Sequence, residues 1–85
     1  MRPSENQVSC SLQGEAVILN YKSGVYYGLN PVGARIWELI QESKTTREVH
    51  EALLGEYEVD SVRCWNDLVP LLAELRQAGL IELEE

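Results

Sequence analysis

Apolar and polar residues alternate in three short runs within the first thirty positions of the chain. Alternation with a period of two, rich in β-branched and aromatic residues, is typical of half-buried strands. In the first run Val8, Cys10 and Leu12 alternate with polar residues, so we expect these three to form the buried face of a strand. The predicted strands cover residues 8–12, 16–21 and 25–29.

Two short turn sequences separate these runs. Gly14-Glu15 follows the first run, and Lys22-Ser23-Gly24 follows the second. Connections this short join adjacent antiparallel strands. The pattern therefore predicts a three-stranded antiparallel meander with the second strand in the middle and the third, Val25–Leu29, at an edge.

Beyond residue 30 the apolar positions follow a helical period. Asn30 is a good N-cap, and Pro31 suits the first position of a helix that we expect to run to about Glu42. Gly33 in its first turn lowers helix propensity, which indicates a close backbone contact there. Thr45 and Glu48 form a capping box for a second helix, which we expect to close near Tyr57.

A third helix is predicted from the N-cap Asp60 to about Ala78, with Gly79 as its stop. Pro70 lies inside it and removes one hydrogen bond, so we expect a bend over residues 66–70. Residues 80–83 are expected to form a short extended tail. The fold class is therefore α+β, a three-stranded antiparallel sheet followed by three helices in a single domain over residues 1–85.

The chain carries 7 basic and 14 acidic residues and a net charge of −7. Its basic residues are scattered, whereas DNA binding needs a Lys/Arg patch, so we predict no nucleic-acid partner. The longest clean apolar run is residues 16–19, far too short for a membrane span. The first residues hold no apolar signal region, so we expect a cytoplasmic protein with Cys10 and Cys64 reduced.

We find no set of residues that would build a catalytic or metal centre. His50 is the only histidine, and we interpret it as a solvated helix residue rather than a general base. One histidine and two distant cysteines do not supply the ligands of a zinc site, and the glycines form no phosphate loop. Asp60-Ser61-Val62 is similar to the Asp-Ser-Leu motif of acyl carrier proteins, but Asp60 is explained as a helix cap. We therefore expect no enzyme activity and no cofactor.

The third helix is apolar over roughly 220° of its circumference, whereas burying one face needs little more than about 100°. The excess either packs on the sheet and both other helices at once or lines a groove. The third strand favours a groove, because as an edge strand it contains no Lys, Pro or inward charge to protect it. Tyr26 and Tyr27 either accept a foreign peptide there or simply cover the sheet or a dimer edge.

Residues 26–40 contain Leu29-Asn30, Gly33 and Ile36-Trp37-x-Leu39. This stretch resembles the core motif of the PQQ-biosynthesis peptide chaperone family, also called RiPP recognition elements. Downstream residues fit the same pattern, so the resemblance covers about residues 15–83. The downstream matches are Thr45, Val49, Leu53, Tyr57, Val59, Asp60, Leu72, Leu75, Gly79, Leu80 and Ile81.

The resemblance implies a winged helix-turn-helix-like fold that binds the leader peptide of a ribosomally made precursor. In this family the leader adds as a strand to strand three, in the cleft toward helix three. The small acidic chain is most similar to the stand-alone leader-binding protein of lasso-peptide pathways, whose partners are a leader peptidase and a lasso cyclase. The resemblance implies these peptide-binding residues: Val25, Tyr26, Tyr27, Gly28, Leu29, Asp67, Leu68, Leu71, Glu74 and Leu75.

Two alternatives stay open at this point. A PQQ-type peptide chaperone would share the same motif. A winged-helix DNA-binding protein would share the fold, although the net charge of −7 argues against it.

Overall fold

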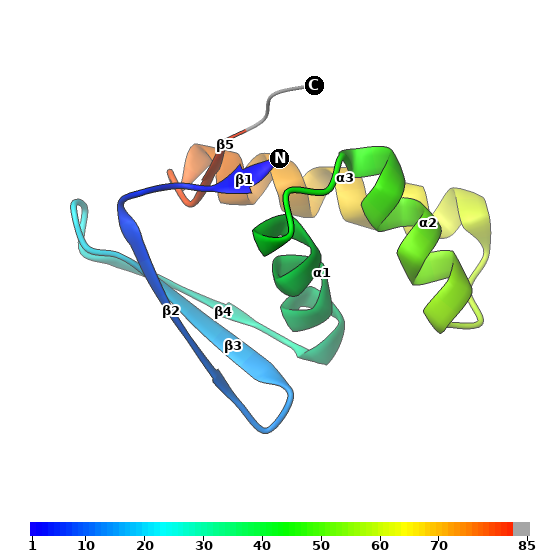
Figure 1. The fold of residues 1–85 in the computed structure, drawn as a ribbon, viewed down its shortest axis with the longest axis horizontal. Coiled ribbons are helices and arrows are strands. Elements are labelled where there is room, and N and C mark those ends of the chain that lie inside the picture. The colour runs from blue at the N-terminus through cyan, green and yellow to red at the C-terminus, as the bar shows by residue number, and fades with distance from the viewer. Residues whose placement is uncertain (83–85) are drawn as a thin grey trace.

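A computed structural model describes residues 1–82 of the chain (Figure 1). The sheet β2-β3-β4 is antiparallel, and three helices follow it, so the predicted fold class is confirmed. The strands are β1 (Arg2–Pro3), β2 (Gln7–Leu12), β3 (Glu15–Asn20), β4 (Val25–Leu29) and β5 (Ile81–Glu82). The helices are α1 (Pro31–Gln41), α2 (Thr46–Glu56) and α3 (Ser61–Gln77).

The turn between β2 and β3 lies one residue earlier than expected. Gln13 and Gly14 form it, with φ values of 52° and 81°, and Glu15 already belongs to β3. Leu12 therefore pairs with Glu15 across a two-residue connection. Two successive residues with positive φ are typical of the tight turns whose twist suits a hairpin.

The predicted buried face of β2 is wrong. Ala16, Ile18 and Asn20 of β3 face the interior, and residues paired across a sheet share a face, so their partners on β2 face inward too. Those partners are Ser11, Ser9 and Gln7, of which Ser9 and Gln7 are half-buried and Ser11, at the end of the strand, is exposed. Val8 is consequently 58% exposed and Cys10 is exposed, while the side chain of Leu12 lies outside the described residues.

The two ends of the described chain form a strand pair that the pattern did not predict. β1 pairs antiparallel with β5, and the Ser4 N–H donates to the Leu80 carbonyl at 2.9 Å. The expected tail at residues 80–83 is thus partly a strand, and Leu83 lies outside the described residues. Figure 1 shows this small sheet beside the C-terminal end of α3.

The helix boundaries follow their predicted caps. Asn30, Thr45 and Asp60 each accept a backbone N–H from the first turn of their helix, and Glu48 completes the capping box. Gly79 ends α3 with a φ of 73°. α3 runs without interruption through Pro70, and the bend expected there stays a prediction.

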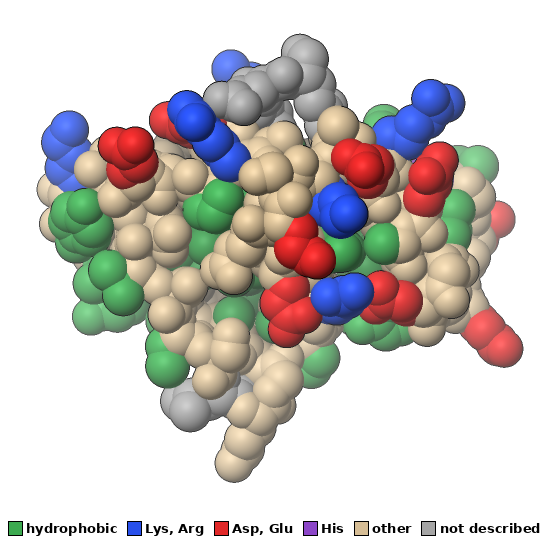
Figure 2. Space-filling model, in the orientation of Figure 1, with side chains coloured by type: hydrophobic (Ala, Val, Ile, Leu, Met, Phe, Trp, Pro, Cys, Tyr) green, Lys and Arg blue, Asp and Glu red, His purple; other side chains and the backbone are tan. Residues whose placement is uncertain are grey.

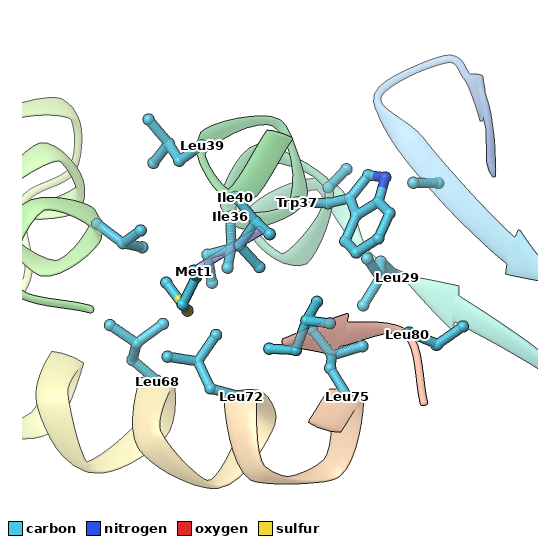
Figure 3. Close-up of a cluster of buried hydrophobic side chains, with 14 of the residues drawn as sticks. Met1, Leu29, Ile36, Trp37, Leu39, Ile40, Leu68, Leu72, Leu75 and Leu80 are labelled. Atoms are coloured by element: carbon cyan, nitrogen blue, oxygen red, sulfur yellow. The ribbon is translucent and has the colours of Figure 1, made fainter. Parts of the chain in front are cut away.

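The helices meet the sheet around one apolar core (Figure 3). α1 packs against β3 and β4 with its buried stripe, which includes Ile36, Trp37 and Ile40. α3 contributes Leu68, Leu72 and Leu75 from the opposite side. Because of this packing, β4 and α3 face each other across a gap. The sequence predicted a groove between these two elements.

Candidate functional site

Strand β4 lies at the edge of the sheet, and no described strand pairs with its outer side. Its side chains alternate: Tyr27 and Leu29 are directed toward the helices, whereas Tyr26 is 69% exposed. Leu29 is buried and Tyr27 is half-buried. An unpaired edge offers backbone N–H and C=O groups to another strand.

A groove of about 410 Å³ lies beside this edge. Its walls come from β4, α1, α2 and α3, and most of the residues that line it are apolar. The lining residues are Tyr27, Gly28, Leu29, Asn30, Val32, Gly33, Ile36, Leu53, Val59, Arg63, Cys64, Asp67, Leu68 and Leu71.

Six of the ten residues expected to bind a peptide line this groove, namely Tyr27, Gly28, Leu29, Asp67, Leu68 and Leu71. The other four lie elsewhere. Val25 and Tyr26 are exposed on β4 outside the groove, and Glu74 lies at its margin beside Tyr27. Leu75 is fully buried in the core and presents no surface to a ligand.

A hydrogen bond spans the groove at the Tyr27 end. The Tyr27 hydroxyl of β4 donates to the Glu74 carboxylate of α3. This bond, with partial burial and the negative charge of Glu74, raises the pKa of Tyr27 to about 12. The contact connects the two groove walls and favours the neutral form of the Tyr27 phenol.

The other end of the groove was not predicted from the helix and strand patterns. α1 supplies Val32 and Ile36 there, and Leu53 and Val59 close it from α2 and the α2–α3 connection. Gly33 lets α1 approach β4: a Cβ at this position would lie 3.2 Å from two atoms of Leu29. The close contact expected at Gly33 is therefore present. Gly33 is the one sequence feature that pointed to this end of the groove.

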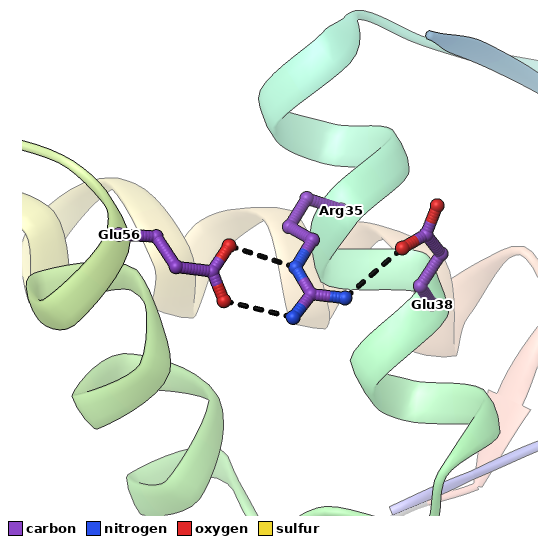
Figure 4. Close-up of polar contacts among 3 residues, drawn as sticks. All are labelled: Arg35, Glu38 and Glu56. Carbon is purple, nitrogen blue, oxygen red and sulfur yellow. Dashed lines mark hydrogen bonds and ion pairs between the residues drawn. The ribbon is translucent and has the colours of Figure 1, made fainter.

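An ion-pair cluster fixes the α2 side of that end (Figure 4). The Arg35 guanidinium of α1 donates two hydrogen bonds of 2.8 Å to Glu56, the last residue of α2, and one of 3.0 Å to Glu38. Glu56, followed by Glu38, raises the pKa of Arg35, and Arg35 in turn lowers the pKa of Glu56. A bidentate arginine–carboxylate pair has a defined geometry, so it positions the start of the α2–α3 connection that carries Val59.

The α3 wall of the groove carries charge as well as apolar surface. Arg63 and Asp67 form an ion pair at 4.0 Å, and both side chains are largely exposed. Burial, together with the nearby Asp67, raises the pKa of the Cys64 thiol between them. A raised pKa reduces the thiolate fraction, so Cys64 acts here as a small apolar side chain.

His50 differs from its predicted solvated state. It is half-buried, its Nε2 lies 3.0 Å from the Ser61 carbonyl oxygen, and its ring meets Trp65 edge-on. These contacts join α2 to the first turns of α3. The histidine therefore helps to hold α2 against α3, the helix that carries one wall of the groove.

On the face drawn in Figure 2, acidic and basic side chains are mixed: blue side chains lie singly among red ones and do not gather into a patch. Within residues 1–82, no group of three or more His, Cys, Asp or Glu residues could hold a metal ion. None of the described helices is long and apolar enough to cross a membrane.

Comparison with known proteins places this geometry in a family. The family model described as coenzyme PQQ synthesis protein D (PqqD) matches residues 15–81. The chain belongs to the PqqD family. The matched segment of this PqqD-family chain runs from β3 into β5 and includes every lining residue of the groove.

Two solved structures resemble this PqqD-family chain over nearly its whole length. "TbiB1 in Complex with the TbiA(beta) Leader Peptide" has 35% sequence identity and a TM-score of 0.89, covering 100% of both chains. "Lasso peptide synthetase B1 complexed with the leader peptide" has 25% identity and a TM-score of 0.81, covering 93% of both chains. No curated protein matches the chain.

Proposed function

We propose that this chain binds the leader peptide of a ribosomally made precursor, of the lasso-peptide type, by adding the leader as a strand to β4. The observation that carries the proposal is the unpaired edge of β4 beside an apolar groove. In strand addition, main-chain hydrogen bonds supply affinity, and pockets for alternate side chains supply specificity. β4 supplies an edge from Val25 to Leu29 for the main-chain hydrogen bonds. The groove beside this edge offers space for side chains of the added strand.

The comparisons support the ligand class in this proposal. Both similar structures are complexes with a leader peptide, and one is described as a lasso peptide synthetase component. The similarity to TbiB1 extends over the whole chain, so β4, α3 and the groove between them lie within it. The description of the second structure as a lasso peptide synthetase favours a lasso-type leader over a PQQ-type precursor.

We further propose that the chain is a non-enzymatic adaptor of cytoplasmic lasso-peptide maturation. It holds the leader and presents the core peptide to a separate leader peptidase and then to a lasso cyclase. Incubating the purified chain with its precursor is expected to leave the peptide intact by mass spectrometry. Cleavage or cyclisation by the chain alone would contradict this role.

The binding mode is tested by titrating the ¹⁵N-labelled chain with the leader encoded in the same gene cluster. We expect a dissociation constant between about 10 nM and 10 μM. The largest shift changes are expected at Val25–Leu29 and at Asp67 to Leu71, with β2 unchanged. A leader with N-methylated backbone positions is the control, because it keeps its side chains but cannot donate to β4. Shifts confined to α2 or β2 would reject strand addition to β4.

A DNA-binding role is tested in parallel by a gel-shift assay on duplex DNA. The net charge of −7 predicts no retained band at low salt. Salt-sensitive duplex binding would favour the winged-helix alternative.

A further inference from the structure

The groove has charged side chains at defined positions along α3. Among the described residues that line it, Arg63 is the one basic side chain, in a chain with net charge −7. Its side chain is 84% exposed. The start of α3 is already capped by the Asp60 carboxylate, which accepts the Arg63 N–H at 3.0 Å. A ligand at this end therefore meets the guanidinium of Arg63 rather than the helix terminus.

The pairing of Arg63 within the protein is weak. Its Nε lies 4.0 Å from the Asp67 carboxylate, and both groups face water. An exposed i, i+4 pair of this kind contributes about 0.3–0.5 kcal/mol. A carboxylate brought in by a ligand can therefore compete with Asp67 for the guanidinium at little cost.

The opposite end of the groove is acidic. Glu74 lies there with its carboxylate bonded to the Tyr27 hydroxyl. Arg63 and Glu74 are eleven positions apart on one helix, which corresponds to about 16 Å along its axis. A strand rises about 3.3 Å per residue, so about five residues of an extended peptide cover that distance.

We propose that Arg63 binds an acidic side chain of the bound leader, at the end of the groove near the α2–α3 connection. This inference rests on the proposed leader-binding function and specifies its ligand class. The leader carries an Asp or Glu opposite Arg63, and a basic residue about five positions away is favoured near Glu74.

The same charge order defines the direction of the bound strand. β4 runs from the Glu74 end, at Tyr27, toward the Arg63 end, where α1 begins. Figure 1 shows β4 and α3 running in opposite directions. A leader whose acidic residue precedes its basic residue therefore runs antiparallel to β4, and the reverse order runs parallel.

The test uses a displayed library of random dodecapeptides selected on the whole chain. Peptides that bind the wild type but do not bind the Leu71→Ala variant are taken as groove binders. The same library is selected on Arg63→Glu and on the control Arg47→Glu. Arg47 is an exposed arginine in the first turn of α2, and it does not line the groove. Both variants change the net charge by the same amount, so they share any long-range electrostatic effect.

We expect wild-type groove binders to carry an Asp or Glu at one fixed position. The Arg63→Glu variant is expected to select Lys or Arg there, with affinity for the acidic peptides falling about tenfold. Arg47→Glu is expected to select the same peptides as the wild type. Circular dichroism of each variant confirms that it is folded.

Two other results would overturn the inference in different ways. Groove binders without an acidic position, or the same acidic peptides on Arg63→Glu, would reject the role of Arg63 and leave leader binding intact. If the wild type retains no peptide that Leu71→Ala loses, the groove itself does not bind peptides. The proposed function would then fail together with the inference.

Discussion

The two outer strands of the sheet, β2 and β4, differ in what lies beside them. Both are edge strands of the same three-stranded sheet, and neither contains a Lys, Pro or charged residue that would block a further strand. β4 is flanked by a groove of about 410 Å³ and is connected to α3 through Tyr27 and Glu74. β2 directs the polar residues Gln7 and Ser9 inward and Val8 to solvent.

We infer from this contrast that an unprotected edge alone would not make a peptide site. The backbone groups of β2 and β4 are chemically equivalent, so hydrogen bonding alone would not select between them. What differs is the apolar surface available to the side chains of an added strand. The proposed preference for β4 would therefore originate in α1, α2 and α3, which build the groove together with β4.

The largest effect is expected at Asn20, which connects the β4 side of the sheet to α3. Its amide donates to the Ala78 carbonyl at 2.9 Å and accepts the N–H groups of Lys22 and Ser23 in the turn before β4. Asn20→Ala removes three bonds at a buried site and is expected to cost about 2–3 kcal/mol of unfolding free energy. Urea denaturation measures this loss.

Ser9→Ala on β2 is the matched control for Asn20. The Ser9 hydroxyl accepts one long bond of 3.4 Å from exposed Gln41. We expect a change below about 0.5 kcal/mol, because Ser9→Ala removes only this one long bond to an exposed side chain. Equal losses in the two variants would contradict the structural role of Asn20.

The second largest effect concerns the apolar side chains beside β4. Leu71→Ala and Tyr27→Ala are each expected to weaken leader binding by about 1–3 kcal/mol, because truncation removes apolar contact area. Isothermal titration calorimetry measures the affinity. Val8→Ala on β2 is the control and is expected to bind like the wild type. Unchanged affinity in both folded groove variants would remove the groove from the binding model.

The carboxylates of the α3 wall are expected to have a smaller effect. Glu74→Ala removes a negative charge that would attract a Lys or Arg of the leader. We predict several-fold weaker binding and a shallower salt dependence for this variant, since exposed pairs contribute about 0.2–1 kcal/mol. Asp67→Ala removes the partner that competes with a leader carboxylate for Arg63, so it is not expected to weaken binding. Titrations at two salt concentrations measure both quantities. Glu51→Ala, on the exposed side of α2, is the control.

The smallest effect is the pH dependence of the Tyr27–Glu74 contact. Folding raises the pKa of Tyr27 from 10.0 to about 12, so the native state favours the neutral phenol. The stabilisation is fully present below pH 10 and is lost as the pH rises toward 12. The difference in tyrosinate absorbance between the wild type and Tyr27→Phe measures this pKa. Glu74→Gln is expected to shift it back toward 10, and an unchanged pKa there would contradict the cause.

Local signals predicted the helices well, because each helix start is a side-chain cap that the sequence shows directly. Asn30, Thr45 and Asp60 are such residues, and their bonds to the first turn are present. The turn at Gln13 and Gly14 was displaced by one residue. The inverted face of β2 has a different cause, because Ala16 and Ile18 on β3 decide which of its residues face the helices.

The groove was only half predictable from the sequence. The strand pattern pointed to Tyr27, and the family resemblance added Leu29 and Leu71; these three belong to the elements that form the two long walls of the groove. Val32 and Leu53 come from other helices, and nothing in their local sequence specifies a neighbour across the fold. Leu75 was assigned to the groove by the family resemblance, which matches positions but does not show which side of the helix meets the core, and Leu75 is buried there.

The pairing of β1 with β5 has a consequence for the order of folding. It joins Arg2 to Glu82, while the β2–β3 and β3–β4 hairpins and the helices rest on contacts close in sequence. Closing a loop this long costs more chain entropy than closing a hairpin, so we expect the pair to form after the transition state. Ile81, which is buried in that strand, then reports on the late step. Ile81→Ala is expected to speed unfolding in stopped-flow experiments and leave the refolding rate unchanged.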